Sequence, residues 1–341
     1  MLLTADFLTE KQSTIFFHGN RILKLLKVSI SRCEKNVLIF PNDFLLMESK
    51  FNLFHFFLQS GLSPSENYDR LISIEEISLE SKNYFYECFK DEFIVGYELT
   101  DLTVSLLELF NIPYINIWLH PVRFMDDEMF MIKTNQKQYR DRLQQYSFPE
   151  DIFYINAEYI KIYLQNKMNG FALNKNSCVI FGQTDSDKTL RSKVGRLKLT
   201  NFQDKIVKLC SNYNNIFYSK HPLADLNPEV NEMLIDLGIE IIKENSYKIL
   251  AHANLALVAT ISSSIGVEAY FFKKNVLFFN QPTCDCMDKN TVTCGTEIFS
   301  VPFWKNILYG ETLSLQNSFL CSKNKIRNIL DAYYAYGVIE K

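Results

Sequence analysis

Short apolar runs alternate with helical patterns along most of this chain. Such alternation builds parallel sheets covered by helices, so the sequence predicts an α/β protein. The second half is the cleaner of the two and predicts about five strands in a Rossmann-like, nucleotide-sized domain. The expected strands are 14–17, 36–40, 92–95 and 114–118 in the first half, and 178–181, 216–219, 239–242, 255–258 and 276–279 in the second.

The stretch 133–175 separates these halves. It lacks strand patterns, is rich in tyrosine, and contains an amphipathic run over 152–166 followed by Asn169 and Gly170. Asn and Gly supply the backbone freedom that a hinge needs. We therefore expect a first domain over 1–175 and a second over 176–320.

Composition limits the function classes. The chain has 341 residues, is 47% hydrophobic and carries a net charge of -3. It has enough apolar residues for a large core, and its lack of a basic field argues against nucleic acid as a partner. No apolar run is long enough to cross a bilayer, and the N-terminus lacks the basic residues of a secretory signal, so we expect a cytoplasmic protein.

The eight cysteines are expected to be reduced thiols. The one cluster, formed by Cys284, Cys286 and Cys294, lacks a fourth ligand at zinc spacing. We therefore expect no metal site.

The stretch 177–190 combines a buried-strand pattern with a polar loop. Gly182 ends the strand, and Gln183, Asp185 and Asp187 follow it. Ligands collect at the carboxyl ends of strands in open parallel sheets, so these residues are candidates for chemistry. The alternative is an ordinary acidic loop that caps the next helix.

Two further strand ends of the second half carry anion-binding groups. Lys220 and His221 precede Pro222, and the hydroxyls of 262–264 precede a helical pattern. Free amide groups at a helix N-terminus favour phosphate. Neither segment has a P-loop or a dinucleotide-binding fingerprint. The alternatives are a packed structural histidine and a simple serine cap.

Polar residues also follow two strands of the first half. Glu98 follows the third strand, and His120 and Arg123 follow the fourth. Both strand ends are expected to open on the same edge of the sheet, which is a candidate acceptor site. The alternatives are a helix-start acid for Glu98 and a surface ion pair between Arg123 and Asp126.

Taken together, these motifs resemble the β-Kdo glycosyltransferases of bacterial capsule and lipopolysaccharide assembly. Gln183-x-x-x-Asp187-x-Thr189 resembles their Gln-x-x-x-Asp-x-Ser/Thr element, and Lys220-His221-Pro222 resembles their His-Pro element. Their serine-bearing element resembles Ser263-x-x-Gly266-x-Glu268-Ala269. The order and spacing agree over about 100 residues of the second half. Thr189 stands in place of a serine, and Asp185 adds a second acid to the loop.

This resemblance implies a GT-B fold, in which two Rossmann-like domains face each other across a cleft. The first domain would bind a glycan or lipid-linked glycan acceptor, and the second would bind CMP-Kdo. The C-terminal segment 321–341, through its amphipathic run 325–336, would cross back to the first domain. Contact with the inner face of the cytoplasmic membrane would be peripheral and salt-sensitive, and the product would be a capsule, lipopolysaccharide or O-antigen glycan.

The resemblance also implies residue roles. Family members are retaining, which makes Asp187 the nucleophile of a glycosyl-enzyme, with Glu98 or His120 as the acid or base for the acceptor. Arg123 would contact the acceptor. CMP leaves with a single phosphate, so no metal ion and no cofactor is required. The donor would be held by Gln183, Asp185, Thr189, Lys220, His221, Ser262, Ser263, Ser264 and Glu268.

Two other functions stay open at this point. Inverting GT-B transferases of CMP-sialic acid or another nonulosonic acid also carry His-Pro and serine motifs, but their acid-Asp-Gly base motif is absent, because Asp126 and Asp127 are followed by Glu128. A non-catalytic GT-B-like subunit of a polysaccharide assembly complex would tolerate substitution of the Asp and His.

Overall fold

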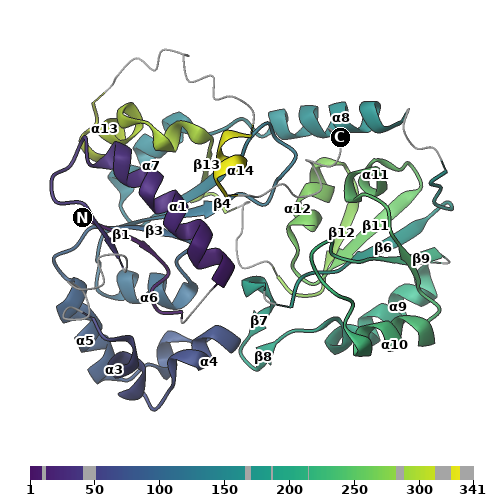
Figure 1. Cartoon of the computed structure of the whole chain (residues 1–341), viewed down its shortest axis with the longest axis horizontal. Coiled ribbons are helices and arrows are strands. Elements are labelled where there is room, and N and C mark those ends of the chain that lie inside the picture. Colours follow the sequence, from purple (N-terminus) through teal and green to yellow (C-terminus); the bar gives the residue numbers. More distant parts are fainter. Residues whose placement is uncertain are drawn as a thin grey trace. The chain divides into compact units, whose positions relative to one another are not determined.

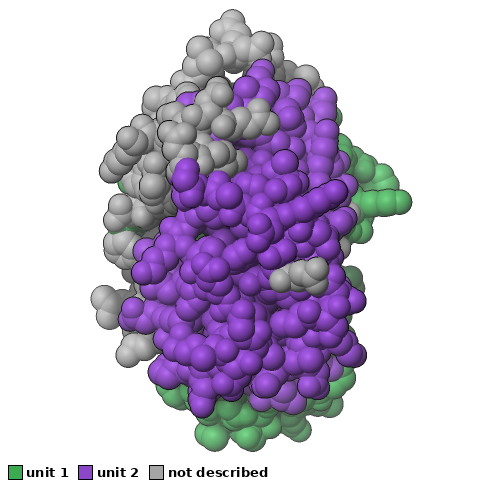
Figure 2. All heavy atoms as spheres, turned by 90° about the vertical axis from the view of Figure 1, so that its right-hand side faces the viewer, with its two compact units in different colours: residues 1–120, 126–148, 286–332 green, residues 121–125, 149–285, 333–341 purple. Residues whose placement is uncertain are grey.

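The computed structural model describes residues 1–9, 13–40, 51–165, 170–185, 187–213, 215–281, 288–311 and 324–330. The chain divides into two compact units, which Figure 2 colours separately. The first unit comprises 1–120, 126–148 and 286–332, and the second comprises 121–125, 149–285 and 333–341. Each unit is an α/β structure built around its own sheet.

The first unit has a six-stranded sheet in the order β13-β5-β4-β3-β1-β2. Figure 1 labels β13, β4, β3 and β1 of this sheet. The strands β2, β1, β3 and β4 run parallel, whereas β5 and β13 are antiparallel to their neighbours. The strand bounds are β1 Leu2–Ala5, β2 Leu38–Phe40, β3 Ile94–Tyr97, β4 Tyr114–Leu119, β5 Phe130–Thr134 and β13 Val292–Cys294.

Alternating residues of these strands fill two separate cores. Leu3, Val95 and Ile115 pack with the helices α1 (Ser13–Ile30) and α13 (Val301–Tyr309). Their neighbours Leu2 and Ile94 pack with a second set of helices. A period of two sends successive side chains to opposite faces, so each face receives its own helical layer. The second core involves α3 (Leu53–Leu58), α5 (Leu79–Phe89) and α6 (Asp101–Leu109).

Other elements complete the first unit. The helix α4 (Pro64–Asp69) follows α3, and α7 (Lys137–Leu143) follows β5 and packs against α13. The C-terminal helix α14 (Lys325–Leu330) packs against α1, so the described part of the 325–336 run belongs to the first unit. The remainder of that run lies outside the described residues.

The predicted strand at 14–17 is wrong, because these residues open the helix α1. Ile22, Leu23, Leu26 and Ile30 continue the helix and are all buried in the core. Their spacing follows the period of a helix, and burial of this stripe overrides the local strand preference of the preceding residues.

The second unit has a five-stranded, fully parallel sheet in the order β10-β9-β6-β11-β12. In chain order this is 3-2-1-4-5, the Rossmann arrangement that the sequence predicts. The central strand β6 is buried along its whole length. The bounds are β6 Ser177–Phe181, β9 Asn215–Ser219, β10 Glu240–Ile242, β11 Leu255–Thr260 and β12 Asn275–Phe278.

Helices cover this sheet, and a small hairpin follows its central strand. The helices are α8 (Asp151–Gln165), α9 (Gln203–Asn212), α10 (Pro228–Asp236), α11 (Ser246–Ala251) and α12 (Ser264–Phe271). The hairpin pairs β7 (Arg191–Ser192) with β8 (Gly195–Arg196). No helix within the described ranges is long and apolar enough to span a membrane.

The unit boundaries differ from those expected. The helix α8 belongs to the second unit, where it packs against α11 and α12 and where Phe153 contacts Phe271 at 5.0 Å between ring centroids. The segment 286–311 returns to the first unit, because β13 pairs with β5 and α13 fills the first core. The amphipathic pattern of 152–166 predicted the helix α8 but not its packing partners, and no pattern in the sequence predicted that β13 and α13 belong to the first unit.

Candidate active site

The candidate site lies in the second unit, where the chain order of its strands reverses. Gln183 follows β6, and Ser262 follows the adjacent strand β11. The first strand in chain order is β6 and the fourth is β11, so the carboxyl ends of this pair form the topological switch point at which ligands bind in such sheets.

Gln183 connects the two strand ends. Its Oε1 accepts the backbone N–H of Ser262 at 2.8 Å. Its Nε2 lies 3.2 Å from Asp187 Oδ2, 3.1 Å from Thr189 Oγ1 and 3.3 Å from Ser262 Oγ. An amide has only two N–H hydrogens, so these acceptors share them. The Gln, Asp and Thr of the predicted motif therefore form one hydrogen-bonded cluster with Ser262.

Asp187 accepts hydrogen bonds on both carboxylate oxygens. Its Oδ1 accepts the backbone N–H of Thr189 at 2.9 Å and the Thr189 hydroxyl at 3.0 Å. It thereby caps the single helical turn Lys188–Leu190. The same carboxylate therefore caps a helical turn, as the alternative interpretation of this loop expected, and also takes part in the cluster with Gln183. Thr189 also receives the Ser262 hydroxyl at 2.9 Å.

Asp185 lies apart from this cluster. Its side chain is exposed, and its backbone carbonyl accepts a hydrogen bond from Arg196 Nη1 at 3.2 Å. The structure therefore brings Asp187, and not Asp185, into contact with Gln183 and Thr189.

His221 follows β9 and is partly buried. Its Nδ1 accepts the backbone N–H of Leu223 at 3.1 Å, which places the proton of the neutral ring on Nε2. Burial lowers the pKa of His221, and the charge of Asp187 partly opposes this shift. His221 therefore favours the neutral form, with one N–H donor to offer. Lys220, its neighbour, is exposed.

Gly182 is required by the packing at the base of the loop. A Cβ at this position would lie 2.2 Å from the Tyr218 hydroxyl oxygen and 2.9 Å from its Cζ. Tyr218 lies on β9 with its ring buried, and burial, followed by the charge of Asp185, raises its pKa to about 12. Sequence reasoning missed Tyr218, because a single sequence does not show which side chain packs against Gly182.

Ser263 and Ser264 begin α12. Ser263 occupies the N-cap position, but its side chain makes no capping hydrogen bond. The first-turn amide groups of α12 are therefore not capped by this hydroxyl, which leaves the helix start suited to an anion. Gly266 permits close packing in the first turn, because a Cβ there would lie 2.5 Å from the Phe278 ring.

Glu268 and Arg123 are brought together by a contact that the sequence did not predict. Glu268 is 3% exposed, and its Oε1 accepts the Tyr247 hydroxyl at 2.9 Å and the backbone N–H of Arg123 at 2.6 Å. This contact anchors the segment 121–125 in the second unit. Arg123 is therefore not part of the first unit, where the sequence placed it, and Glu268 Oε1 holds its backbone.

Glu98 and His120 belong to the first unit and follow β3 and β4. Glu98 is half-buried and its backbone N–H donates to the Ile117 carbonyl at 2.8 Å. His120 is only 2% exposed, and its backbone N–H donates to the Met129 carbonyl at 2.8 Å. The burial of its ring makes His120 the less accessible of the two groups.

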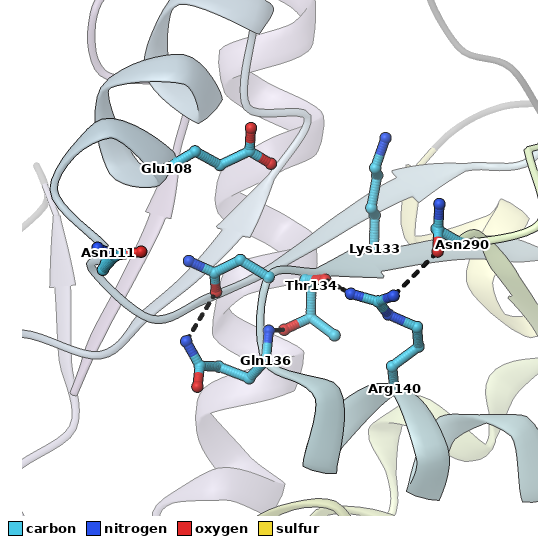
Figure 3. Close-up of a pocket in the computed structure, with 8 residues that line it drawn as sticks. Glu108, Asn111, Lys133, Thr134, Gln136, Arg140 and Asn290 are labelled. Carbon is cyan, nitrogen blue, oxygen red and sulfur yellow. Dashed lines mark hydrogen bonds between the residues drawn. The ribbon is translucent and has the colours of Figure 1, made fainter.

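A separate cavity of about 400 Å³ lies at the opposite edge of the first sheet, near the start of β4 and the end of β5 (Figure 3). Arg140 donates to Asn290 Oδ1 at 2.9 Å and to the Thr134 carbonyl at 3.4 Å. Glu108 accepts the Tyr114 hydroxyl at 2.9 Å. The lining is polar, but its groups largely pair with one another, and none of the sequence-predicted site residues is among them. The lining residues are Glu108, Asn111, Lys133, Thr134, Asn135, Gln136, Arg140 and Asn290.

The structure also bears on the expected absence of a metal site. Within the described ranges, no group of three or more His, Cys, Asp or Glu side chains lies in position to hold a metal ion. Cys294 is buried in β13, whereas Cys284 and Cys286 lie outside the described residues.

No protein-family model matches this chain, and no curated protein matches it in sequence. Among solved structures, it is similar to a KpsC of Thermosulfurimonas dismutans described as a β-Kdo 2,7 transferase, with 16% identity, a TM-score of 0.36, and coverage of 60% of this chain and 70% of that one. A KpsC β-Kdo 2,4 transferase from the same organism has 13% identity, a TM-score of 0.35, and coverage of 56% and 69%. UDP-GlcNAc 2-epimerase from Neisseria meningitidis has 13% identity, a TM-score of 0.29, and coverage of 81% and 82%. These likenesses concern the fold alone.

Proposed function

We propose that this chain is a glycosyltransferase that moves Kdo from CMP-Kdo to a glycan acceptor in bacterial surface polysaccharide synthesis, with retention of configuration. The observation that carries the proposal is the cluster of Gln183, Asp187, Thr189 and Ser262 at the switch point of the second sheet. Gln183, Asp187 and Thr189, the three residues of one motif that resembles the transferases, contact one another in the structure.

The donor phosphate would be bound by neutral and cationic donors. The Nε2–H of His221 lies after β9, whereas the hydroxyls of Ser263 and Ser264 and the first-turn amide groups of α12 lie after β11. These two strands flank β6 in the parallel sheet, so both groups lie at the carboxyl ends of its strands. Lys220 adds a cation. The single phosphate of a CMP-sugar needs fewer positive charges than the diphosphate of a UDP-sugar, so we propose that neither a metal ion nor a cofactor takes part.

Asp187 would act as the nucleophile through Oδ2. Oδ1 already accepts two hydrogen bonds from Thr189, whereas among the described residues the Gln183 amide is the one donor to Oδ2, so Oδ2 is the oxygen we propose for attack. In the first step Oδ2 bonds to the anomeric carbon of Kdo, and the bond from that carbon to the phosphate oxygen breaks, with its electron pair leaving on CMP. In the second step an acceptor hydroxyl bonds to the anomeric carbon from the face that CMP left, the bond from that carbon to Asp187 Oδ2 breaks, and the hydroxyl proton goes to a base.

Glu98 is our candidate for that base, since His120 is more deeply buried. The acidic stretch 126–128 lacks the glycine of the base motif of inverting enzymes, and two of its acids bind the helix α14 of the first unit. Asp127 accepts the backbone N–H of Ile326 at 2.9 Å, and the fully buried Glu128 pairs with Arg327 at 3.3 Å. These acids hold the start of α14. With a lipid-linked acceptor, we propose peripheral, salt-sensitive contact with the membrane surface.

The decisive experiment is intact-protein mass spectrometry after mixing the chain with CMP-Kdo alone. We expect CMP release and a Kdo adduct that peptide mapping assigns to Asp187. The Asp187→Asn variant should lose the adduct, whereas the matched Asp185→Asn variant should retain it. Consumption of CMP-sialic acid without an adduct would favour the inverting transferase, and binding without consumption of any CMP-sugar would favour the non-catalytic subunit. Unchanged transfer in EDTA is the check on metal independence.

A further inference from the structure

Glu98 occupies a backbone conformation that few residues adopt. Its φ angle is +52°, in the left-handed region. Among the described residues, the other non-glycine positions with positive φ are Asn36, Asn111, Asn176, Lys273 and Asn324. Asparagine tolerates this region, and Lys273 directly follows the C-cap of α12, where left-handed residues commonly close helices. Neither reason applies to Glu98, because it is not an asparagine and it follows the strand β3 and not a helix.

Asn116 clamps the residue after Glu98. It lies on β4 and is only 4% exposed. Its Oδ1 accepts the backbone N–H of Leu99 at 3.0 Å, and its Nδ2 donates to the carbonyl of the same residue at 3.2 Å. Both backbone polar groups of Leu99 are therefore held by one side chain of the neighbouring strand.

Asp6 fixes the next residue from the other side. It follows β1, and its Oδ1 accepts the backbone N–H of Thr100 at 3.0 Å and the Thr103 hydroxyl at 2.5 Å. The turn 97–100 is thus fastened to β4 and to β1, the two neighbours of β3 in the sheet. Gly96 completes the arrangement, since a Cβ there would lie 2.3 Å from the Leu99 side chain.

A strained residue persists only where its surroundings determine its conformation, and such residues cluster at functional sites. We propose that this turn presents the Glu98 carboxylate to the acceptor hydroxyl as the general base, and that Asn116 and Asp6 are positioning residues that hold it there. This inference rests on the proposed glycosyl transfer and adds two residues to it that no motif identified.

The strain is tested by thermal unfolding, without any activity assay. Glu98→Asn removes the carboxylate and supplies a residue that tolerates the left-handed region. We expect its Tm to rise by roughly 2 to 4 °C. Lys273→Asn, outside the proposed site, is the matched control and should also rise, while leaving transfer unchanged. A Tm for Glu98→Asn that falls below wild type would overturn the claim that the fold holds Glu98 under strain.

The positioning role is tested by a double-mutant cycle on transfer from CMP-Kdo. Glu98→Gln keeps the shape and should lower kcat about 100-fold or more, the usual scale for a general base. Asn116→Ser should lower kcat about 10-fold with little change in the KM for CMP-Kdo, and should have no further effect in the Glu98→Gln background. Equal losses in both backgrounds would show that Asn116 acts only through folding.

Failure of the inference and failure of the proposed function are distinguishable. Wild-type kcat in Glu98→Gln would remove Glu98 from catalysis while leaving glycosyl transfer intact. Absence of any transfer or hydrolysis of CMP-Kdo by the wild-type chain would refute the proposed function, and the base role with it, whereas the Tm measurements would still decide the strain. If Asn116→Ser does not fold, Glu98→Asn and Glu98→Gln still decide between the outcomes.

Discussion

Replacing Gln183 with glutamate would place two carboxylates in hydrogen-bond contact. The Gln183 Nε2 lies 3.2 Å from Asp187 Oδ2, and the substitution exchanges this donor for an oxygen of the same size. Two unit charges 3.2 Å apart repel by about 5 kcal/mol at an effective dielectric constant of 20. The folded variant can avoid most of this repulsion by binding a proton shared by the pair.

The free energy needed to keep that proton bound in the folded state sets the loss of stability in the variant. A glutamate ionises near pH 4.3 in the unfolded chain, and each pH unit above this value costs about 1.4 kcal/mol if the folded state must keep the proton. At pH 7.5 the upper limit is therefore about 4 kcal/mol. Both side chains are partly exposed, and solvent screening reduces the limit, so we expect a loss of about 2 to 3 kcal/mol.

The pH dependence has a definite sign. The carboxyl pair of the variant has a raised pKa in the folded state, so the folded state binds more protons than the unfolded state above pH 4.3. The variant is therefore closest to wild type in stability at pH values below 4.3. It loses stability relative to wild type as the pH rises from there through the raised pKa of the carboxyl pair in the folded state. At pH 4, a protonated glutamate donates to Asp187 and the deficit should be below about 1 kcal/mol.

Calorimetric or circular-dichroism melts between pH 4 and pH 8 measure this effect. For a unit of this size, the deficit at pH 7.5 corresponds to a Tm lower by roughly 4 to 12 °C. Gln183→Leu is the matched control, since it removes the same hydrogen bonds without adding charge and should show a deficit that is independent of pH. Parallel pH curves for the two variants would refute the contact between position 183 and Asp187.

Three further predictions concern the same site. His221→Ala should weaken donor binding or leaving-group departure by about 1.5 to 3 kcal/mol, measured as kcat/KM, whereas a collapsed Tm with normal kinetics would make His221 structural. Asp187→Asn should lower transfer by several orders of magnitude while CMP still binds in calorimetry, and near-normal turnover would contradict the nucleophile assignment; Asp185→Asn should do much less. Gly182→Ala should cost about 1 to 3 kcal/mol by chemical denaturation, and less in a Tyr218→Phe background, where equal costs in both backgrounds would deny the clash at the Tyr218 hydroxyl.

The second unit was largely predictable because its strands are short, apolar and separated by helical patterns. Strand order follows from such alternation, and the switch point follows from strand order, so the neighbourhood of Gln183 and Ser262 could be inferred from the sequence. The first unit was less accessible. β1 contains only Leu2–Ala5, and β5 and β13 are antiparallel strands that the regular alternation does not include.

The site residues that were missed share a different cause. Asn116 and Asp6 are buried polar residues within or just after strands, and a single sequence does not show which backbone groups such side chains bind. Glu268 shows the opposite case, in which a motif identified the residue but not its contacts. It matches a motif position, and its Oε1 accepts hydrogen bonds from the Tyr247 hydroxyl and the backbone of Arg123.

The discontinuity of the first unit has a consequence during synthesis on the ribosome. The chain completes β1 to β5 first, then the whole segment 149–285 of the second unit, and only afterwards β13 and α13. Until β13 emerges, β5 ends the sheet as an edge strand with unpaired backbone groups, and Phe303, Trp304 and Ile307 are missing from the first core. The first unit therefore stays incomplete, with an exposed edge strand that is prone to association, during the whole time in which the segment 149–285 is translated.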